Sequence, residues 1–133
     1  NKGTKSGVKK GMPVVDGNYL IGRTVEVNYL SSRVLLLNDL NSRIPVTIEP
    51  SNAQAIISGS GEDKPKLEYL PEIPLAIGSS VFTSGKDGIF LSGIPIGTTL
   101  LDKNITKVKL FSDPNQLSFV KIIILKKKRE TQF

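Results

Sequence analysis

A buried run, a turn and an alternating strand follow one another in residues 32–48, SRVLLLNDLNSRIPVTI. The apolar run VLLL is typical of a buried strand, and the residues NDLN that follow it carry the side chains of a turn. Ile44, Val46 and Ile48 then alternate with polar residues or proline. Because successive side chains of a strand point to opposite faces, this alternation predicts a strand with one buried face.

The same succession of strand, turn and strand occurs in residues 81–97, VFTSGKDGIFLSGIPIG, where GKDG has the composition of a hairpin turn. Other short apolar or alternating segments, separated by glycine, proline and asparagine, predict strands at residues 20–27, 55–57, 66–70, 94–100, 105–111 and 119–125. No window of about eleven residues carries a convincing helical stripe. The pattern therefore predicts an all-β chain of short, mostly antiparallel strands.

The order of the segments also predicts how the first strands pair. We expect residues 20–27 to pair with residues 34–37, and both to share a sheet with residues 44–48. Pro45 has no N–H group to donate, so the strand at residues 43–49 is predicted to lie at a sheet edge or at a bulge. An edge strand leaves backbone groups open to a partner.

The length of the chain and the position of its turn residues are compatible with two structural modules. A chain of 133 residues can bury a core as one domain or as two small β modules. The break EPSN at residues 49–52 predicts a first module, truncated at its N-terminus, at residues 1–52, and a second at residues 53–133 that ends in a basic tail. This boundary is approximate, and strands can interleave across it. The chain starts without methionine and has no apolar run near the ~20 residues of a membrane helix, so we interpret it as a fragment whose anchor lies outside it.

The net charge of +6 lies mostly at the two ends of the chain. Lysines crowd residues 1–10 and KKKR opens residues 126–133, which leaves the body between them close to neutral. A protein that follows the phosphates of a nucleic acid needs a basic face on its folded body. We therefore expect no nucleic-acid partner, and a nucleic-acid-binding β-barrel stays open only as an alternative.

Histidine and cysteine are both absent from the sequence. Their absence excludes a Ser-His-Asp triad, a Cys-His pair, disulfides and the usual zinc ligand sets. The carboxylates are scattered and lack the spacing of a calcium loop. We expect no metal and no cofactor.

One alternative enzyme remains, a β-barrel hydrolase that uses Ser84 with a lysine. Such a dyad requires a desolvated lysine whose lowered pKa lets it act as the base. Lys86 instead falls in a glycine-flanked turn beside Asp87, where solvent would keep it charged. The sequence therefore favours a protein that is not an enzyme.

The long motifs SRVLLLNDLNSRIPV, EYLP and VFTSGKDGIFLSGIPIG, preceded by NKGTKSGVKKGMPVV, occur in this order. Together they resemble the extracytoplasmic part of the rod shape-determining protein MreC family, from Asn1 to about Leu125. The resemblance implies two small β-barrel-like modules. Leu40 departs from the family, which often has proline there.

The resemblance also implies a function without chemistry. Members of this family are anchored by a single membrane span, and their bulk lies on the periplasmic, extracytoplasmic face of the inner membrane. They act as scaffolds of the cell-wall elongation machinery, maintain rod cell shape, bind its penicillin-binding transpeptidase and an MreD-like membrane partner, and self-associate into homo-oligomers.

Three exposed features are the candidate partner-binding surfaces: the expected edge strand and the two turns at residues 39–42 and 85–88. Edges and loop tips are where strand-built proteins present groups to a partner. The candidate residues are Asp39, Asn41, Arg43, Pro45, Lys86 and Asp87.

Overall fold

The structure is a computed structural model that describes residues 3–70, 75–86, 92–113 and, in backbone only, 120–122. Within these ranges the chain forms strands and one short 3-10 helix, with no α-helix, so the all-β prediction is confirmed. The elements are η1 (Thr4–Ser6), β1 (Pro13–Asp16), β2 (Tyr19–Val27), β3 (Ser32–Leu36), β4 (Arg43–Glu49), β5 (Ala53–Ser58), β6 (Lys66–Glu68), β7 (Ser80–Thr83), β8 (Pro95–Asp102), β9 (Ile105–Leu110) and β10 (Val120–Ile122).

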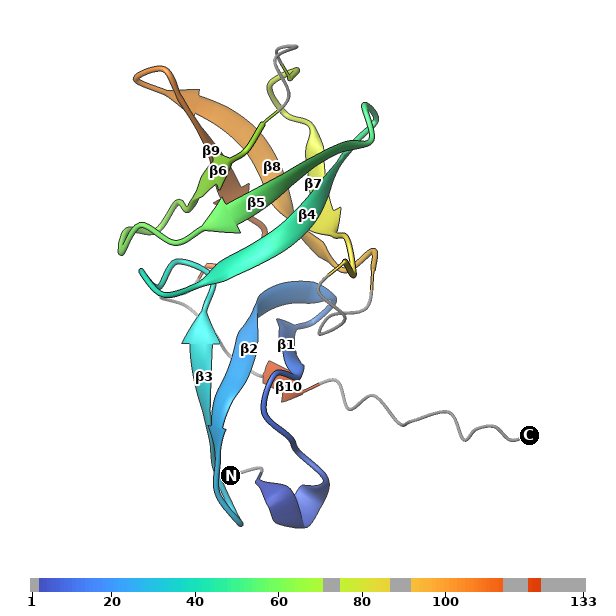
Figure 1. Ribbon diagram of the computed structural model, residues 1–133, viewed down its shortest axis with the longest axis vertical. Coiled ribbons are helices and arrows are strands. Elements are labelled where there is room, and N and C mark those ends of the chain that lie inside the picture. Colours follow the sequence, from blue (N-terminus) through green and yellow to red (C-terminus); the bar gives the residue numbers. More distant parts are fainter. Residues whose placement is uncertain (1–2, 71–74, 87–91, 114–119, 123–133) are drawn as a thin grey trace, which may run out of the picture.

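The strands form two sheets, one closed and one open (Figure 1). The closed sheet is a barrel with the strand order β4-β5-β6-β9-β8-β7, in the upper half of the view. The open sheet below it is four-stranded and has the order β10-β1-β2-β3. Neighbouring strands are antiparallel in both sheets, as the sequence predicts.

Strand β4 has the buried face that its alternation predicts, but it lies in the other sheet. The side chains of Ile44, Val46 and Ile48 are each 0% exposed inside the barrel. The expected pairing of this strand with the first sheet is wrong, because β4 pairs with β5 on one side and with β7 on the other. The expected edge position is wrong for the same reason.

Pro45 is tolerated in β4 because it lies just beyond the end of the hydrogen-bonded pairing between β4 and β7. It faces Ile56 of β5, and its carbonyl oxygen accepts a hydrogen bond from the backbone N–H of Ser84 at 3.2 Å. The N and O atoms of a strand residue point toward the same neighbour, so the missing N–H is directed at the β7 side. There the paired register begins only at Val46 and Thr83.

The two sheets divide the chain at places other than residue 52. β4 precedes that position and belongs to the barrel, whereas β10 follows it and pairs with β1, with Val14 opposite Ile122. The chain therefore leaves the open sheet after β3 and returns to it at β10.

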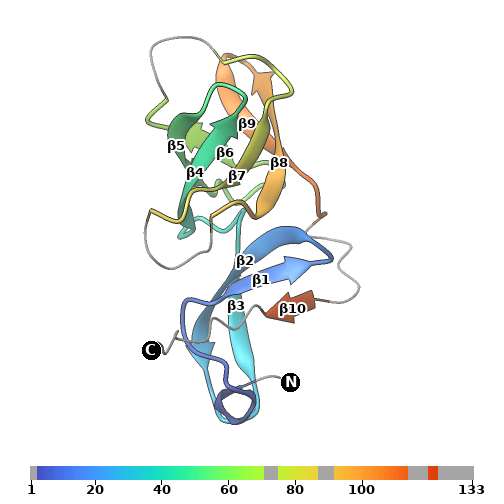
Figure 2. The ribbon, with the colours of Figure 1, turned by 90° about the vertical axis from the view of Figure 1, so that its right-hand side faces the viewer.

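The open sheet lies against one end of the barrel (Figure 2). One continuous hydrophobic core joins the two sheets. Val15, Leu20 and Leu37 of the open sheet and its loop belong to the same buried cluster as Ile96 and the other inward side chains of the barrel. The ring centroids of Tyr19 and Phe111 lie 4.9 Å apart. Shared burial of this kind opposes independent movement of the two sheets.

Candidate partner-binding site

The loop between β3 and β4 carries Asp39 and Asn41 and links the open sheet to the barrel. The Oδ1 atom of Asp39 accepts a hydrogen bond from the backbone N–H of Asn41 at 2.9 Å, and its carbonyl oxygen accepts one from Ser42 at 2.9 Å. An aspartate that bonds the backbone two residues on forms the Asx turn that favours this residue in loops. These bonds fix the loop in one shape.

A second loop, between β5 and β6, supports the first. The N–H group of Gly61 donates to the carbonyl oxygen of Asn38 at 2.8 Å, and that of Gly59 donates to Ser42 at 3.0 Å. A Cβ atom at Gly59 would collide with the carbonyl oxygen of Asp39. The absence of a side chain at Gly59 therefore allows the two loops to approach this closely.

The two loops and β3 line an open cavity of about 420 Å³. Its lining residues are Val34, Leu36, Asn38, Asp39, Leu40, Asn41 and Gly61. The side chain of Leu40 is 72% exposed at this site, although leucine is ordinarily buried. The cavity thus combines apolar side chains with a carboxylate and two amides, a composition typical of binding sites. We call it the junction cavity.

The structure brings Asp39 and Asn41 together at the junction cavity, but it places Arg43 on the barrel wall. The Nη2 atom of Arg43 lies 2.7 Å from Oε1 of Glu68. Lys66 lies 3.5 Å from the other carboxylate oxygen of Glu68. Exposed pairs of this kind contribute at most about 1 kcal/mol, so their main effect is to orient the guanidinium group of Arg43.

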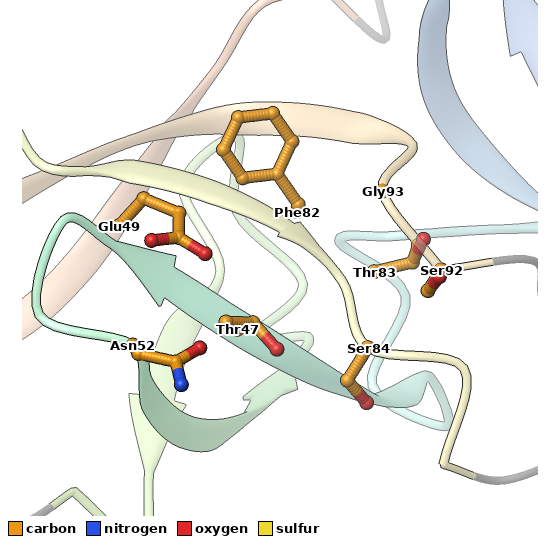
Figure 3. A pocket seen from close by; sticks show the side chains of 8 residues that line it. All are labelled: Thr47, Glu49, Asn52, Phe82, Thr83, Ser84, Ser92 and Gly93. Carbon is orange, nitrogen blue, oxygen red and sulfur yellow. The ribbon is translucent and has the colours of Figure 1, made fainter.

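A second cavity, of about 440 Å³, lies on the outer wall of the barrel near the end of β7 (Figure 3). It is lined by Thr47, Glu49, Asn52, Phe82, Thr83, Ser84, Ser92 and Gly93. Lys86 is exposed in the turn just beyond it. Asp87 lies outside the described residues.

The geometry at Ser84 gives no support to a serine/lysine dyad. Its Oγ atom accepts a hydrogen bond from the backbone N–H of Lys86 at 3.2 Å. The side chain of Lys86 is exposed, whereas a lysine that acts as the base of such a dyad has to be desolvated. Within the described ranges, no group of three or more acidic side chains could hold a metal ion.

One carboxylate in the described part of the barrel has a clearly shifted pKa. The hydrogen bond from Lys107 lowers the pKa of Asp102 below 3.8, and the same bond raises the pKa of Lys107 above 10.5. Their Oδ2 and Nζ atoms lie 2.9 Å apart across the β8–β9 hairpin. Because this pair lines neither cavity, we assign it a structural role.

The sequence patterns predicted an edge position for β4, whereas among the described strands it is β3 that has a neighbour on one side only. A continuous apolar run suggested full burial, yet Val34 and Leu36 are only half-buried. The signal that could have identified the edge is the polar start of the strand, Ser32 and Arg33, because charged side chains are common on sheet edges.

Comparison with protein families matches residues 1–124 to the model described as "Rod shape-determining protein MreC, barrel core". The "Cell shape-determining protein MreC" of Caulobacter vibrioides is 41% identical over 127 residues, which is 93% of this chain and 36% of that protein. The protein of the same name from Cereibacter sphaeroides is 36% identical over 126 residues, which is 92% of this chain and 42% of that protein. The chain thus spans less than half the length of these two relatives.

Solved structures show the same fold. A structure of an MreC aligns with a TM-score of 0.82 at 29% identity, over 92% of this chain and 74% of that one. The crystal structure of MreC from Pseudomonas aeruginosa aligns with a TM-score of 0.81 at 29% identity, over 92% and 84%. A complex between penicillin-binding protein PBP2 and MreC from Helicobacter pylori aligns with a TM-score of 0.67 at 21% identity, over 86% and 79%.

Among the described residues, no helix has the length and apolar character needed to cross a membrane.

Proposed function

The chain belongs to the family of the rod shape-determining protein MreC, and from this premise we propose that it is a non-catalytic scaffold of the cell-wall elongation machinery. The observation that carries the proposal is the family match over residues 1–124, which contain both sheets up to β10. The related protein of Helicobacter pylori forms a complex with a penicillin-binding protein. By this relationship, the partner of the present chain is a peptidoglycan synthase of the penicillin-binding class.

The proposed docking surface is the junction cavity with Asp39, Asn41 and the exposed Leu40. Hydrogen bonds fix both of its loops before any partner arrives, so binding does not require the loops to be ordered at that step. Arg43 directly follows the loop and adds an oriented positive charge at its border. Pro45 and Lys86 lie on the barrel outside this cavity, and we propose them as secondary contacts.

The whole-protein context is part of the same proposal. The parent protein is anchored by a single membrane span outside this chain, and the sheets lie on the extracytoplasmic, periplasmic side. There it maintains rod shape, self-associates and contacts an MreD-like membrane partner. We propose that the open sheet and the barrel are its two modules and that the division runs through the loop at residues 38–42, where the chain passes from one sheet to the other.

The test is a binding measurement with the penicillin-binding transpeptidase ectodomain from the same organism. We expect the wild-type chain to bind and Leu40→Asp to weaken binding about tenfold or more, because the change places a charge in the apolar part of the cavity. Leu101→Asp is the matched control, since Leu101 is also exposed (56%) but lies at the far end of β8. Surface plasmon resonance would give both affinities.

Two results would contradict the proposal. If the wild-type chain did not associate with the ectodomain, the scaffold function would be wrong. If Leu101→Asp weakened binding as much as Leu40→Asp, the docking surface would lie elsewhere. Labelling of Ser84 by a fluorophosphonate probe would instead favour a hydrolase.

A further inference from the structure

The second cavity, on the outer wall of the barrel, lies outside the proposed docking surface (Figure 3). We call it the wall groove. Its lining includes Thr47 and Glu49 of β4, Asn52 of the β4–β5 turn and Phe82 of β7. Both of these strands have neighbours on both sides within the chain, so the groove belongs to the closed wall and does not depend on a sheet edge.

The strand register holds an aromatic ring and a carboxylate together on the outer face of the barrel. Thr47 lies directly opposite Phe82 in the ladder between β4 and β7. Glu49 is two residues further along β4, so its side chain lies on the same face as that of Thr47. Val46 and Ile48, which alternate with these residues, are 0% exposed inside the barrel. Glu49 is thus the diagonal neighbour of Phe82, a separation that long and aromatic side chains can bridge.

The β4–β5 turn adds an amide to this pair. Asn52 has a φ of 61°, in the left-handed region that asparagine adopts more readily than most residues other than glycine. In Figure 3 the side chain of Glu49 lies between those of Phe82 and Asn52. The groove therefore combines an aromatic ring, a carboxylate and an amide.

The polar ends of Glu49 and Asn52 are exposed and open to a ligand. Among the residues that the structure describes, no group pairs with the Glu49 carboxylate or with the side-chain amide of Asn52. The hydroxyl of Thr47, in contrast, accepts a hydrogen bond from Nε2 of Gln54 at 3.1 Å. A carboxylate can accept hydrogen bonds, and an amide can donate and accept them.

These groups fit a neutral sugar. Among the described residues that line the groove, one is acidic and none is basic, so a phosphate or another anion would be repelled. A sugar ring presents an apolar C–H face, which suits the flat apolar face of Phe82, and hydroxyls around its rim, which suit Glu49 and Asn52. The volume of about 440 Å³ is that of a small-molecule site, for which roughly 300–1,000 Å³ is usual.

We propose that the wall groove binds a neutral saccharide unit of a glycan chain, with its C–H face on Phe82 and its hydroxyls on Glu49 and Asn52. The groove is open along the barrel wall, so a longer chain can continue beyond the bound unit. The source of the glycan rests on the proposed function, which puts the barrel on the same side of the membrane as the cell wall. The barrel then contacts the wall polymer at a site separate from the junction cavity.

The first experiment needs no substitution. The chain is titrated with triacetylchitotriose, a neutral trimer of N-acetylglucosamine, and the backbone amide signals are followed by NMR. We expect saturable shifts at Thr47, Asn52 and Phe82. The β8–β9 hairpin and the loop at residues 38–42 should not respond, because neither lines the groove.

The second experiment removes one polar group without disturbing the fold. Asn52→Gly deletes the amide at a φ that glycine adopts without strain, and the affinity for the trimer should fall about fivefold or more. Asn104→Gly is the matched control, because Asn104 is exposed, has a φ of 66° and lies in the β8–β9 turn. This control should bind like the wild type. Phe82→Leu keeps an apolar side chain but loses the flat ring, and it should weaken binding by a similar factor.

The charge of the ligand separates a sugar site from a cation site, because a carboxylate beside an aromatic ring also attracts cations. The comparison is the fully deacetylated trimer, whose amino groups are positively charged. Binding of the neutral trimer should persist at high salt and survive Glu49→Gln, which keeps a hydrogen-bond acceptor. Binding of the deacetylated trimer alone, lost in salt and in Glu49→Gln, would overturn the saccharide proposal.

Co-sedimentation with isolated peptidoglycan sacculi tests the source of the saccharide. We expect the wild-type chain to sediment with the sacculi, the trimer to compete, and Asn52→Gly to sediment less. Trimer binding without co-sedimentation would overturn the glycan chain as the occupant.

The remaining outcomes keep this inference apart from the scaffold function. Absence of shifts with the neutral trimer, shifts spread beyond the groove, or equal losses in Asn52→Gly and Asn104→Gly would overturn the saccharide site. None of these measurements involves the synthase, so the scaffold function would still stand. Absence of synthase binding would contradict the scaffold function, whereas trimer shifts confined to the groove would still support the saccharide site.

Discussion

The barrel and the open sheet are built from the same kind of strand but differ in whether their backbones are fully paired. The barrel closes on itself, so its strands have neighbours on both sides and it keeps no edge. Among the described strands, the open sheet ends at β3, and Val34 and Leu36 of this strand line the junction cavity. The difference teaches that closure pairs and buries every strand of the barrel, whereas the side chains of β3 in the open sheet remain half-buried or exposed except at Leu35.

The largest difference should appear when side chains are shortened inside each sheet. Ile48→Ala leaves a cavity beneath the barrel wall, where Ile48 is 0% exposed, and should lower the free energy of unfolding by about 2–5 kcal/mol. Leu36→Ala in the half-buried strand β3 is the matched change. This variant should lower the free energy of unfolding by less, because part of the Leu36 side chain is already in contact with water. Urea denaturation would measure both. Equal losses would show that the edge strand is as well packed as the barrel.

An intermediate effect is expected where the barrel meets the open sheet. Gly59→Ala places a Cβ atom against the carbonyl oxygen of Asp39, and we expect a loss of about 1–3 kcal/mol because the two loops must separate. Glu62→Ala, which shortens an exposed side chain on the same loop, is the control. Thermal unfolding would report stability, and binding to the ectodomain should weaken together with it. If Gly59→Ala had the stability and the binding of the wild type, the close contact between Gly59 and Asp39 would not be what holds the two loops together.

The smallest effect is the pH dependence of the ion pair in the β8–β9 hairpin. The pKa of Asp102 is lowered in the folded state, so its contribution is present above pH 3.8 and is lost as the pH falls through the folded pKa. The pKa of Lys107 is raised, so its contribution is present below pH 10.5 and is lost as the pH rises through the folded pKa.

Asp102→Asn should therefore flatten both ends of the stability profile, measured as the urea midpoint from pH 2 to pH 11. The double variant Asp102→Asn, Lys107→Met should show the same acid limb as Asp102→Asn alone. An unchanged acid limb in Asp102→Asn would contradict the assignment of the pair.

Much of the fold could be predicted because it depends on local patterns. The alternation of Ile44, Val46 and Ile48 identified the buried face of β4, and NDLN identified a turn whose Asp39 does bond the backbone of Asn41. The long motifs identified the family over almost the whole chain. The candidate residues Asp39 and Asn41 do line one cavity, whereas Arg43, Pro45 and Lys86 do not.

The rest depended on pairings between distant segments. The sequence by itself determined which faces are apolar, where the chain turns and which family it belongs to, because side-chain pattern and turn chemistry are written over a few neighbouring residues. Only the tertiary structure decided that β4 closes a barrel against β7, that β10 returns to β1, and that β2 pairs with β3 and not with β4. The physical reason is that ladder hydrogen bonds join backbone groups, which are alike in every residue except proline, so the choice of partner strand comes from packing of the whole chain.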